Sequence, residues 1–382
     1  MNKEHALALL KEVVQMETVL GKETEVVNHL AALFAQHEIP FERVTYAENR
    51  DQLVVTLTGS KGAGPVLGFS GHMDVVPVGE VAWTHPPFAA VEEGELLFGR
   101  GTCDMKAGLI AQVVALIQLK EAGAPFAGTV KLLITVGEET AAVGAGQLTD
   151  LGYADDLDAL VIGEPSQLDV VIAHKGALWP QFTTYGKTAH GSMPQLGVNA
   201  VDQMLEVIRQ FKDTFDFSCA TDTLLGTSTA SLNILQGGSG NNVVPDKCVA
   251  NVDIRTVPGQ NHEKLKADIE EMVRALDGRL EYFKGEVAFV NDLPPIRTEK
   301  DDPFTLLTAE IIRKVAGKEP VIKSLTGYTD GSQFSRAAKD FPIIIVGPGD
   351  TSLAHQPNEC VPIPQFYQMI DVNKEIALNY LR

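Results

Sequence analysis

The sequence predicts an α/β protein whose mixed, largely parallel sheet is flanked by helices and interrupted by a smaller α+β domain. Two observations carry this prediction. Apolar strand-like runs alternate with helical patterns in the first part of the chain and again near its end, which is typical of βα units. Between these parts the order becomes β-α-β-β-α-β, the ferredoxin-like pattern of a small α+β domain.

The predicted elements of the larger domain follow from hydrophobic periodicity. Residues 1–36 predict one or two helices, and two strands divided by a polar turn follow within 39–57. Further strands are expected at 66–69, 129–136, 159–162 and 341–346, and further helices at 105–122, 140–151, 303–316 and 364–380.

The inserted domain is predicted from strands at 178–185, 227–236, 247–255 and 280–290 and helices at 198–215 and 262–275. The chain crosses into and out of it near Lys175 and near the Leu293-Pro294-Pro295 segment. We therefore expect one domain formed by residues 1–176 and 294–382 and an insert formed by residues 177–293.

Composition limits the possible partners and compartment. The 382-residue chain has a formal net charge of −19 and no basic block, which disfavours nucleic acid and anionic membranes as partners. Its four cysteines show no CxxC spacing, which argues against a disulfide framework. The N-terminal segment lacks the uninterrupted apolar core of a signal peptide, so a cytoplasmic location is expected.

A first candidate metal-binding pair follows the strand at 66–69. His72 and Asp74 are two residues apart, a spacing that places both side chains on one face of an extended chain. His72 could bind a metal while Asp74 orients it. On its own, such a pair is more often a solvated or core histidine than a metal ligand. Asp104, before the helix predicted at 105–122, is by itself also a common helix N-cap.

Further candidate ligands follow other predicted parallel strands. Glu138 and Glu139 come after the strand at 129–136, Glu164 after 159–162 and His355 after 341–346. The carboxyl ends of parallel strands share one edge, where α/β sheets place their ligands. Considered alone, each of these acidic segments is also typical of a turn or helix N-terminus.

Together with His72 and Asp104, these residues suit a pair of zinc, cobalt or manganese ions. Two dications facing Asp104, Glu139 and Glu164 leave one positive charge, which a bridging hydroxide neutralises. Glu138 is then the spare carboxylate, free to act as general base.

Several segments resemble one family in its own order. SGHMDVVP, GRGTCDMKAG, the GEE after an apolar strand, VIGEP, GKTAHGSMP and AHQPNE are similar to the aminoacylase, acetylornithine deacetylase and succinyl-diaminopimelate desuccinylase family of dinuclear zinc metallohydrolases. The resemblance covers nearly the whole chain. It implies two zinc ions per subunit, with these ligands: His72 and Glu164 for one ion, Glu139 and His355 for the other, and Asp104 bridging both.

The same resemblance implies roles for other residues. Asp74 would support the ligand His72, Glu138 would be the general base, and the Asp104–Met105 peptide bond would be cis. The insert would be a lid and dimerisation domain whose His190 reaches the partner subunit's metal site and steadies the oxyanion. Substrate-binding positions implied or expected are Lys175, Asn242, Arg255, Gly327 and Thr329.

The implied reaction is hydrolysis of the amide bond of an anionic N-acyl amino acid. Ala173-His174-Lys175-Gly176 resembles the deacetylases, whereas the desuccinylases usually carry two arginines before this glycine. The segments GYTDGSQF and NECV resemble the desuccinylases instead. Two alternatives stay open: a dipeptidase or carboxypeptidase using the same metals, and a catalytically silent metal-binding protein.

Overall fold

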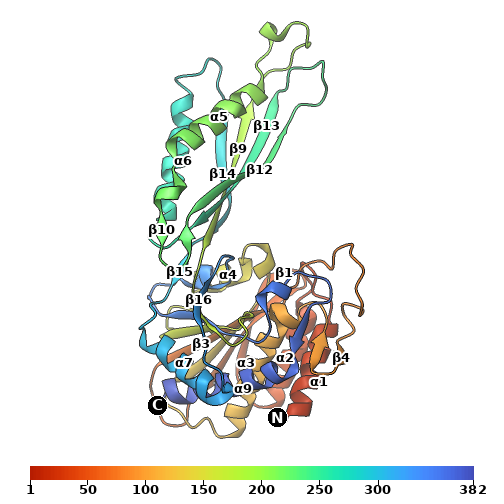
Figure 1. Cartoon of the computed structure of the whole chain (residues 1–382), viewed down its shortest axis with the longest axis vertical. Coiled ribbons are helices and arrows are strands. Elements are labelled where there is room, and N and C mark those ends of the chain that lie inside the picture. Colours follow the sequence, from red (N-terminus) through yellow and green to blue (C-terminus); the bar gives the residue numbers. More distant parts are fainter. The chain divides into compact units, whose positions relative to one another are not determined.

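The computed structural model describes all 382 residues, which form two compact units (Figure 1). The first unit comprises residues 1–173, 296–325 and 329–382. The second comprises residues 174–295 and 326–328. The short segment 326–328 departs from the sequence prediction, which assigned it to the larger domain. Within the second unit the Tyr328 ring lies 5.9 Å from the Arg255 guanidinium, a contact that no sequence pattern indicates.

The larger unit is built on a mixed sheet. Its helices are α1 (Lys3–Gln15), α2 (Thr24–Gln36), α3 (Ala107–Glu121), α4 (Val143–Asp150), α7 (Pro303–Ala316), α8 (Gly331–Phe334) and α9 (Ile363–Tyr380). Its strands are β1 (Phe41–Ala47), β2 (Arg50–Thr58), β3 (Val66–His72), β4 (Val91–Glu93), β5 (Leu96–Phe98), β6 (Thr129–Thr135), β7 (Ala159–Ile162), β8 (Val170–His174), β15 (Ile296–Arg297), β16 (Ile322–Leu325), β17 (Ile343–Ile345) and β18 (Cys360–Pro362).

The main sheet has nine strands in the order β1-β2-β6-β3-β7-β17-β8-β15, with β16 paired to β8. The four adjacent strands β6, β3, β7 and β17 are parallel. Strands β1, β2 and β8 are antiparallel to their neighbours. The predicted α/β class with a mixed sheet is therefore confirmed. Strands β8 and β16 were not predicted, because β8 (VVIAH) is a short apolar run without alternation and β16 (IKSL) has only two apolar residues.

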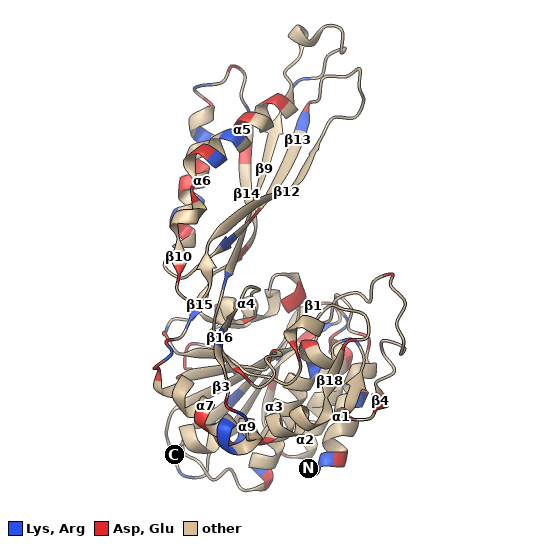
Figure 2. Cartoon of the chain, viewed as in Figure 1, with Lys and Arg blue, Asp and Glu red and all other residues tan.

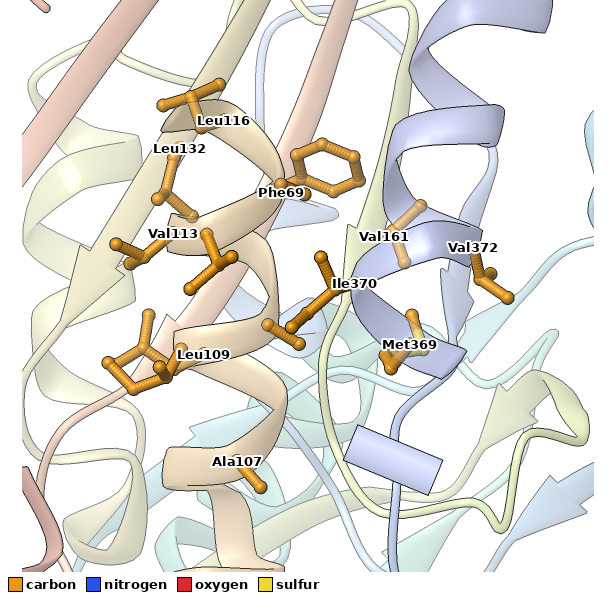
Figure 3. Packing of buried hydrophobic residues seen from close by; sticks show 14 of the residues in the cluster. Phe69, Ala107, Leu109, Val113, Leu116, Leu132, Val161, Met369, Ile370 and Val372 are labelled. Carbon is orange, nitrogen blue, oxygen red and sulfur yellow. The ribbon is translucent and has the colours of Figure 1, made fainter. Parts of the chain in front are cut away.

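Helix α3 forms the centre of the large core (Figure 3). Its sequence is apolar on nearly every face, as expected of a helix with no side toward solvent. Val113 and Leu116 of α3 belong to one cluster with Phe69 of β3 and Ile370 of α9. The segment Thr102–Glu121 is long and apolar enough to span a membrane, but 89% of its apolar window is buried inside the protein. It is the core helix of this unit.

Two glycines bring the start of α3 against the loop after β7. A Cβ on Gly108 would lie 1.7 Å from the Gly163 carbonyl oxygen, far inside van der Waals contact. Only glycine at position 108 permits this approach, and Glu164 is the next residue of the loop. The packing of α3 therefore sets the position of one predicted ligand.

We expect Gly108→Ala to destabilise the protein by about 1–3 kcal/mol or more, because backbone must move to accommodate the methyl group. Gly146→Ala in α4 is a matched control, since a Cβ there would have its nearest contact at 3.4 Å. That variant should be neutral or more stable by up to about 1 kcal/mol, because alanine favours a helix interior. Urea unfolding of both proteins checks the pair, and equal stabilities would contradict the close approach.

The second unit has helices packed on an antiparallel sheet. Its main elements are β9 (Gly176–Tyr185), α5 (Ala200–Thr214), β12 (Thr229–Gly237), β13 (Lys247–Thr256), α6 (His262–Leu276) and β14 (Gly285–Leu293), with a small hairpin formed by β10 (Thr221–Asp222) and β11 (Gly226–Thr227). The sheet order β12-β13-β9-β14 with antiparallel neighbours corresponds to a ferredoxin-like arrangement. Residues on β13 alternate between buried and partly exposed, so one sheet face packs on α5 and α6.

The last strand of this unit begins later than the sequence predicts. β14 starts at Gly285 instead of residue 280, because turns follow the end of α6 and Tyr282 adopts a φ of 59°. Helices α5 and α6 contain both acidic and basic residues (Figure 2), which form exposed pairs such as Arg209–Asp213 and Lys264–Asp268. These i,i+4 pairs are typical of solvated helix faces.

Candidate metal centre

The parallel strands bring the candidate ligands to one edge of the sheet. His72 is the last residue of β3 and pairs with Thr135, the last residue of β6. Glu138 and Glu139 follow β6, and Glu164 follows β7, whose Ile162 pairs with β17. Because these four strands point the same way, their carboxyl ends and the loops after them meet.

The first group of ligand atoms comprises His72, Asp104 and Glu164. His72 Nε2 lies 3.2 Å from Asp104 Oδ1 and 3.4 Å from Glu164 Oε1. His72 is fully buried, and Glu164 is 6% exposed. We call these residues the first triplet.

The second group comprises Asp104, Glu139 and His355, which we call the second triplet. His355 Nε2 lies 3.3 Å from Asp104 Oδ2 and 3.1 Å from Glu139 Oε1. Its side chain is half exposed. Within each triplet all potential ligand atoms lie within 4.8 Å of one another.

Asp104 is shared between the triplets through different oxygens. Its Oδ1 faces His72 and its Oδ2 faces His355. A carboxylate in this position suits a bridge between two cations, and imidazole nitrogen with carboxylate oxygen suits zinc or similar divalent ions. The donor set therefore fits two metal ions. The Asp104–Met105 peptide bond is cis, as predicted.

The charges of the cluster also favour added cations. Burial, followed by the nearby negative charge of Asp104, raises the pKa of Glu164 to about 8. Hydrogen bonds to Asp104 and Glu139 raise the pKa of His355 to about 10. Burial alone would lower the pKa of His72, but Glu164, Asp104 and Asp74 raise it well above its usual value. Carboxylates crowded in this way repel one another, and divalent ions would relieve that repulsion.

Asp74 lies beside His72 and also contacts the turn that carries Glu138 and Glu139. Its carboxylate lies near the imidazole of His72, with 3.6 Å between Asp74 Oδ1 and His72 Nδ1. The same His72 Nδ1 atom lies closer, at 2.9 Å, to the backbone carbonyl oxygen of Asp74. The Asp74 carboxylate accepts hydrogen bonds from the backbone amides of Glu138 and Glu139, at 3.2 and 3.1 Å. It thereby fixes the turn that carries both glutamates.

Glu138 lies next to the ligands without joining either triplet. Its side chain is buried, and burial raises the pKa of its carboxyl well above the usual range. His72 opposes this rise, while Glu164 and Glu139 add to it. The preceding Gly137 has a φ of 68°, and a Cβ there would lie 2.5 Å from Val143 Cγ2. A side chain at position 137 would therefore strain the turn that carries both glutamates.

The substrate-binding candidates of the second unit form two local groups. The His190 and Asn242 loops are paired, because Gly191 N donates to Asn242 O at 2.7 Å and His190 bridges to Val243. His190 is exposed, and its Nδ1 lies 2.8 Å from Ser192 Oγ.

The other group contains Lys175 and Arg255. Lys175 Nζ donates to the Thr227 carbonyl oxygen at 2.6 Å. Arg255 Nε lies 3.0 Å from Asp253 Oδ1, and its guanidinium lies over the Tyr328 ring. Gly327 precedes this tyrosine in the second unit, whereas Thr329 belongs to the first unit, where its Oγ1 accepts from Gly331 N at 3.1 Å.

Three buried charged residues lie near the ligands; sequence reasoning gave Arg100 and Glu359 no role and expected Asp330 only as part of a loop that lines the substrate pocket. Asp330 accepts a 2.5 Å hydrogen bond from Thr135 Oγ1, and burial raises its pKa to about 7, which His72 opposes. Arg100 and Glu359 form a buried ion pair. All three lie within the segments that carry the family resemblance. Their burial is a signal that appears only after folding.

Comparison with known proteins identifies the family. A model of peptidase family M20/M25/M40 matches residues 68–379. A Staphylococcus aureus protein named probable succinyl-diaminopimelate desuccinylase is 33% identical to this chain, over 100% of this chain and 98% of that protein.

Solved structures agree in fold. An M20 family metallo-carboxypeptidase from Sulfolobus solfataricus has a TM-score of 0.81 at 20% identity, covering 100% of this chain and 99% of the other. A dinuclear metal binding peptidase of the M20 family from Bacillus subtilis has a TM-score of 0.73 at 16% identity, covering 99% and 98%. These structural similarities concern the fold alone. The match to the family model and the full-length relative at 33% identity show that the chain belongs to peptidase family M20/M25/M40.

Proposed function

We propose that this chain is a two-metal deacylase that hydrolyses the amide bond of N-acyl amino acids, with Glu138 as general base. One observation carries the proposal. Asp104 directs one oxygen to each of two ligand triplets, and the buried Glu138 precedes the ligand Glu139 without joining either triplet. An amidohydrolase needs this combination of a site for paired cations and a separate proton acceptor.

Each residue of the site has a defined task in this proposal. His72, Asp104, Glu139, Glu164 and His355 would hold the metal ions. When bound, such ions lower the pKa of water and polarise the substrate carbonyl.

Asp74 holds the backbone of Glu138 and so fixes where its carboxylate points. Glu138 would take a proton from the attacking water and transfer it to the leaving nitrogen. The products are a carboxylate and a free amino acid.

The residues before Gly176 bear on which acyl group the site would accept. A succinyl group adds a second carboxylate, which a bidentate arginine would recognise best. Here His174 is fully buried, and burial lowers its pKa to about 4, so it is neutral at pH 7. Only Lys175 offers positive charge, and its ammonium already donates to Thr227 O. Against this, the full-length relative is named a probable succinyl-diaminopimelate desuccinylase. N-succinyl-diaminopimelate is therefore the first substrate proposed, followed by N-acetylornithine.

A peptidase is the second candidate, because structures with the same fold include a metallo-carboxypeptidase and a tripeptidase. A dipeptidase or carboxypeptidase would use the same ligands and the same base. It differs in accepting an α-amino-acyl group in place of the acyl group. The presence of all five candidate ligands and Glu138 argues against a catalytically silent protein.

Mass-spectrometric detection of released amine tests the proposal. The metal-free protein is reconstituted with zinc, cobalt or manganese and supplied with N-succinyl-diaminopimelate, N-acetylornithine, other N-acyl amino acids and dipeptides. Selective cleavage of acyl amino acids supports a deacylase, whereas selective cleavage of dipeptides would replace it by the peptidase. In a Lys175→Met variant, a KM raised for the succinyl substrate alone assigns the second carboxylate to Lys175.

We further propose a homodimer formed through the second unit, in a cytoplasmic enzyme with zinc as the native ion. In this proposal His190 acts at the partner's metal site, where it stabilises the oxyanion. Its side chain is exposed and contacts Ser192, two residues further along the chain, so it is available for such a role.

His190→Ala should lower kcat about 10²- to 10³-fold, the usual effect of removing one oxyanion donor, with metal content unchanged. Mixing His190→Ala with Glu138→Gln protein should restore part of the activity, because a mixed dimer contains one site with both residues intact. Activity of the mixture, measured against each variant alone, checks this prediction. No recovery after verified subunit exchange would exclude a shared site.

A further inference from the structure

We propose that Arg100 and Glu359 are a pair of positioning residues that holds the second triplet, Asp104, Glu139 and His355, ready for its metal ion. The inference rests on the two-metal site of the proposed function but not on its substrate. The pair belongs to neither triplet and touches the backbone of two of the three ligands.

The ion pair is almost completely removed from solvent. Arg100 Nη1 lies 2.6 Å from Glu359 Oε2, and the side chains are 2% and 0% exposed. Such a pair gains little unless further hydrogen bonds offset the desolvation of both charges. Here those hydrogen bonds go to backbone groups around the metal site, so the pair joins chain segments that are far apart in sequence.

Glu359 acts on the shared ligand. Its Oε1 accepts hydrogen bonds from the backbone amides of Cys103 and Asp104, at 2.8 and 3.0 Å. These bonds hold the chain where Asp104 turns one oxygen to each triplet. The Glu359 carbonyl oxygen also accepts a hydrogen bond from Gly99 N at 2.9 Å. Glu359 is therefore held through both its side chain and its backbone.

Arg100 contacts the backbone of the loop that carries His355. Its Nη2 donates to the carbonyl oxygens of His355 and Pro77, at 3.4 and 3.3 Å. His355 adopts a φ of 64°, a left-handed conformation that costs a non-glycine residue energy and persists only where surrounding contacts hold it. The guanidinium also lies 5.0 Å from the Trp83 ring centre. Arg100 thus holds the His355 backbone in the conformation that directs its imidazole to Asp104.

The remaining ligands are held by other contacts. His72 ends β3, and its ring is fixed by the Asp74 carbonyl. The amide of Glu139 is held by the Asp74 carboxylate, and Glu164 follows β7 directly. The pair therefore contacts two ligands of the second triplet and only the shared Asp104 of the first. Its loss should weaken the second metal position more than the first.

Cobalt(II) titration of the metal-free protein, followed by its visible spectrum and by equilibrium dialysis, tests this asymmetry. Arg100→Lys keeps the charge but loses the planar fork that reaches both carbonyls. Glu359→Gln keeps an acceptor for the two amides but sets an NH₂ group against Arg100. Both variants should bind one ion with near wild-type affinity and the other about 10- to 100-fold more weakly, the usual effect of removing a partner of a metal ligand. Their one-ion spectrum should match that of His355→Ala and differ from that of Glu164→Gln.

The control is Asp292→Asn, which breaks an ion pair with Lys266 in the second unit, a unit that supplies no residue to either triplet. It should bind both ions as the wild type does. Unchanged affinity in both Arg100→Lys and Glu359→Gln, or equal weakening of both ions, would overturn the inference, as would loss of the folded state in both variants. A wild-type protein that binds only one ion would instead contradict the proposed two-metal function.

Discussion

Replacing Glu138 with glutamine is expected to lower kcat by about 10²- to 10⁴-fold, the usual contribution of a positioned general base. Glutamine has nearly the same shape but cannot accept a proton at neutral pH. The Asp74 carboxylate accepts from the backbone amide of residue 138, so the turn should form in the variant as well. KM should change little, because the residue belongs to neither ligand triplet.

The measurement combines steady-state kinetics with metal analysis of the same sample. Retention of both ions with collapsed turnover is the expected pattern. Glu139→Gln is the matched comparison, because the neighbouring residue is a ligand candidate of the second triplet and its loss should reduce metal content as well as turnover. A Glu138→Gln protein that keeps most of its rate would refute the base assignment.

Asp104→Ala is expected to weaken both metal positions at once. The two Asp104 oxygens face different imidazoles, at 3.2 and 3.3 Å, so this one substitution removes an oxygen ligand from each triplet. Glu164→Ala and His355→Ala remove a ligand from one triplet only and should each leave one ion bound. Turnover should be lost in Asp104→Ala, because neither position would then be reliably filled.

Stability gives a second measure of the same prediction. An ion present at 100 times its Kd stabilises the folded state by about 2.7 kcal/mol, so two such ions would contribute about twice that amount. Chelation should lower the unfolding free energy of the wild type by this amount. The decrease should be about half as large in Glu164→Ala and very small in Asp104→Ala. Urea unfolding with and without chelator checks the series. A chelator effect of wild-type size in Asp104→Ala would exclude the bridging role.

Much of the site's location could be predicted because it follows from rules of local sequence. The apolar runs of β3, β6 and β7 are continuous, which indicates strands covered on both faces. Once these strands are taken as parallel, the residues after them must share an edge. The placement of His72, Glu138 and Glu164 at that edge needed no knowledge of side-chain packing.

Contacts between distant segments could not be predicted in the same way. The Asp74 carboxylate was expected near His72, two residues away, and lies there; that it also accepts hydrogen bonds from amides 64 and 65 residues along the chain could not be predicted. Strand β16 joins the sheet only by pairing with β8, and the assignment of residues 326–328 to the second unit depends on tertiary contacts. Sequence periodicity reports on residues a few positions apart. Each of these features depends on contacts between residues that are far apart in the chain.

The α/β class, the inserted β-α-β-β-α-β segment and the residues that could bind metal were predictable from the chain alone, because each depends on local pattern and on residue chemistry. How Asp104 divides its oxygens between two triplets, and how Arg100 meets Glu359, 259 positions away, depend on tertiary packing. Hydrogen-bond direction and burial exist only after distant segments pack together. The role of a buried charge can be inferred only when its partners are known, and the order of residues along the chain does not reveal those partners.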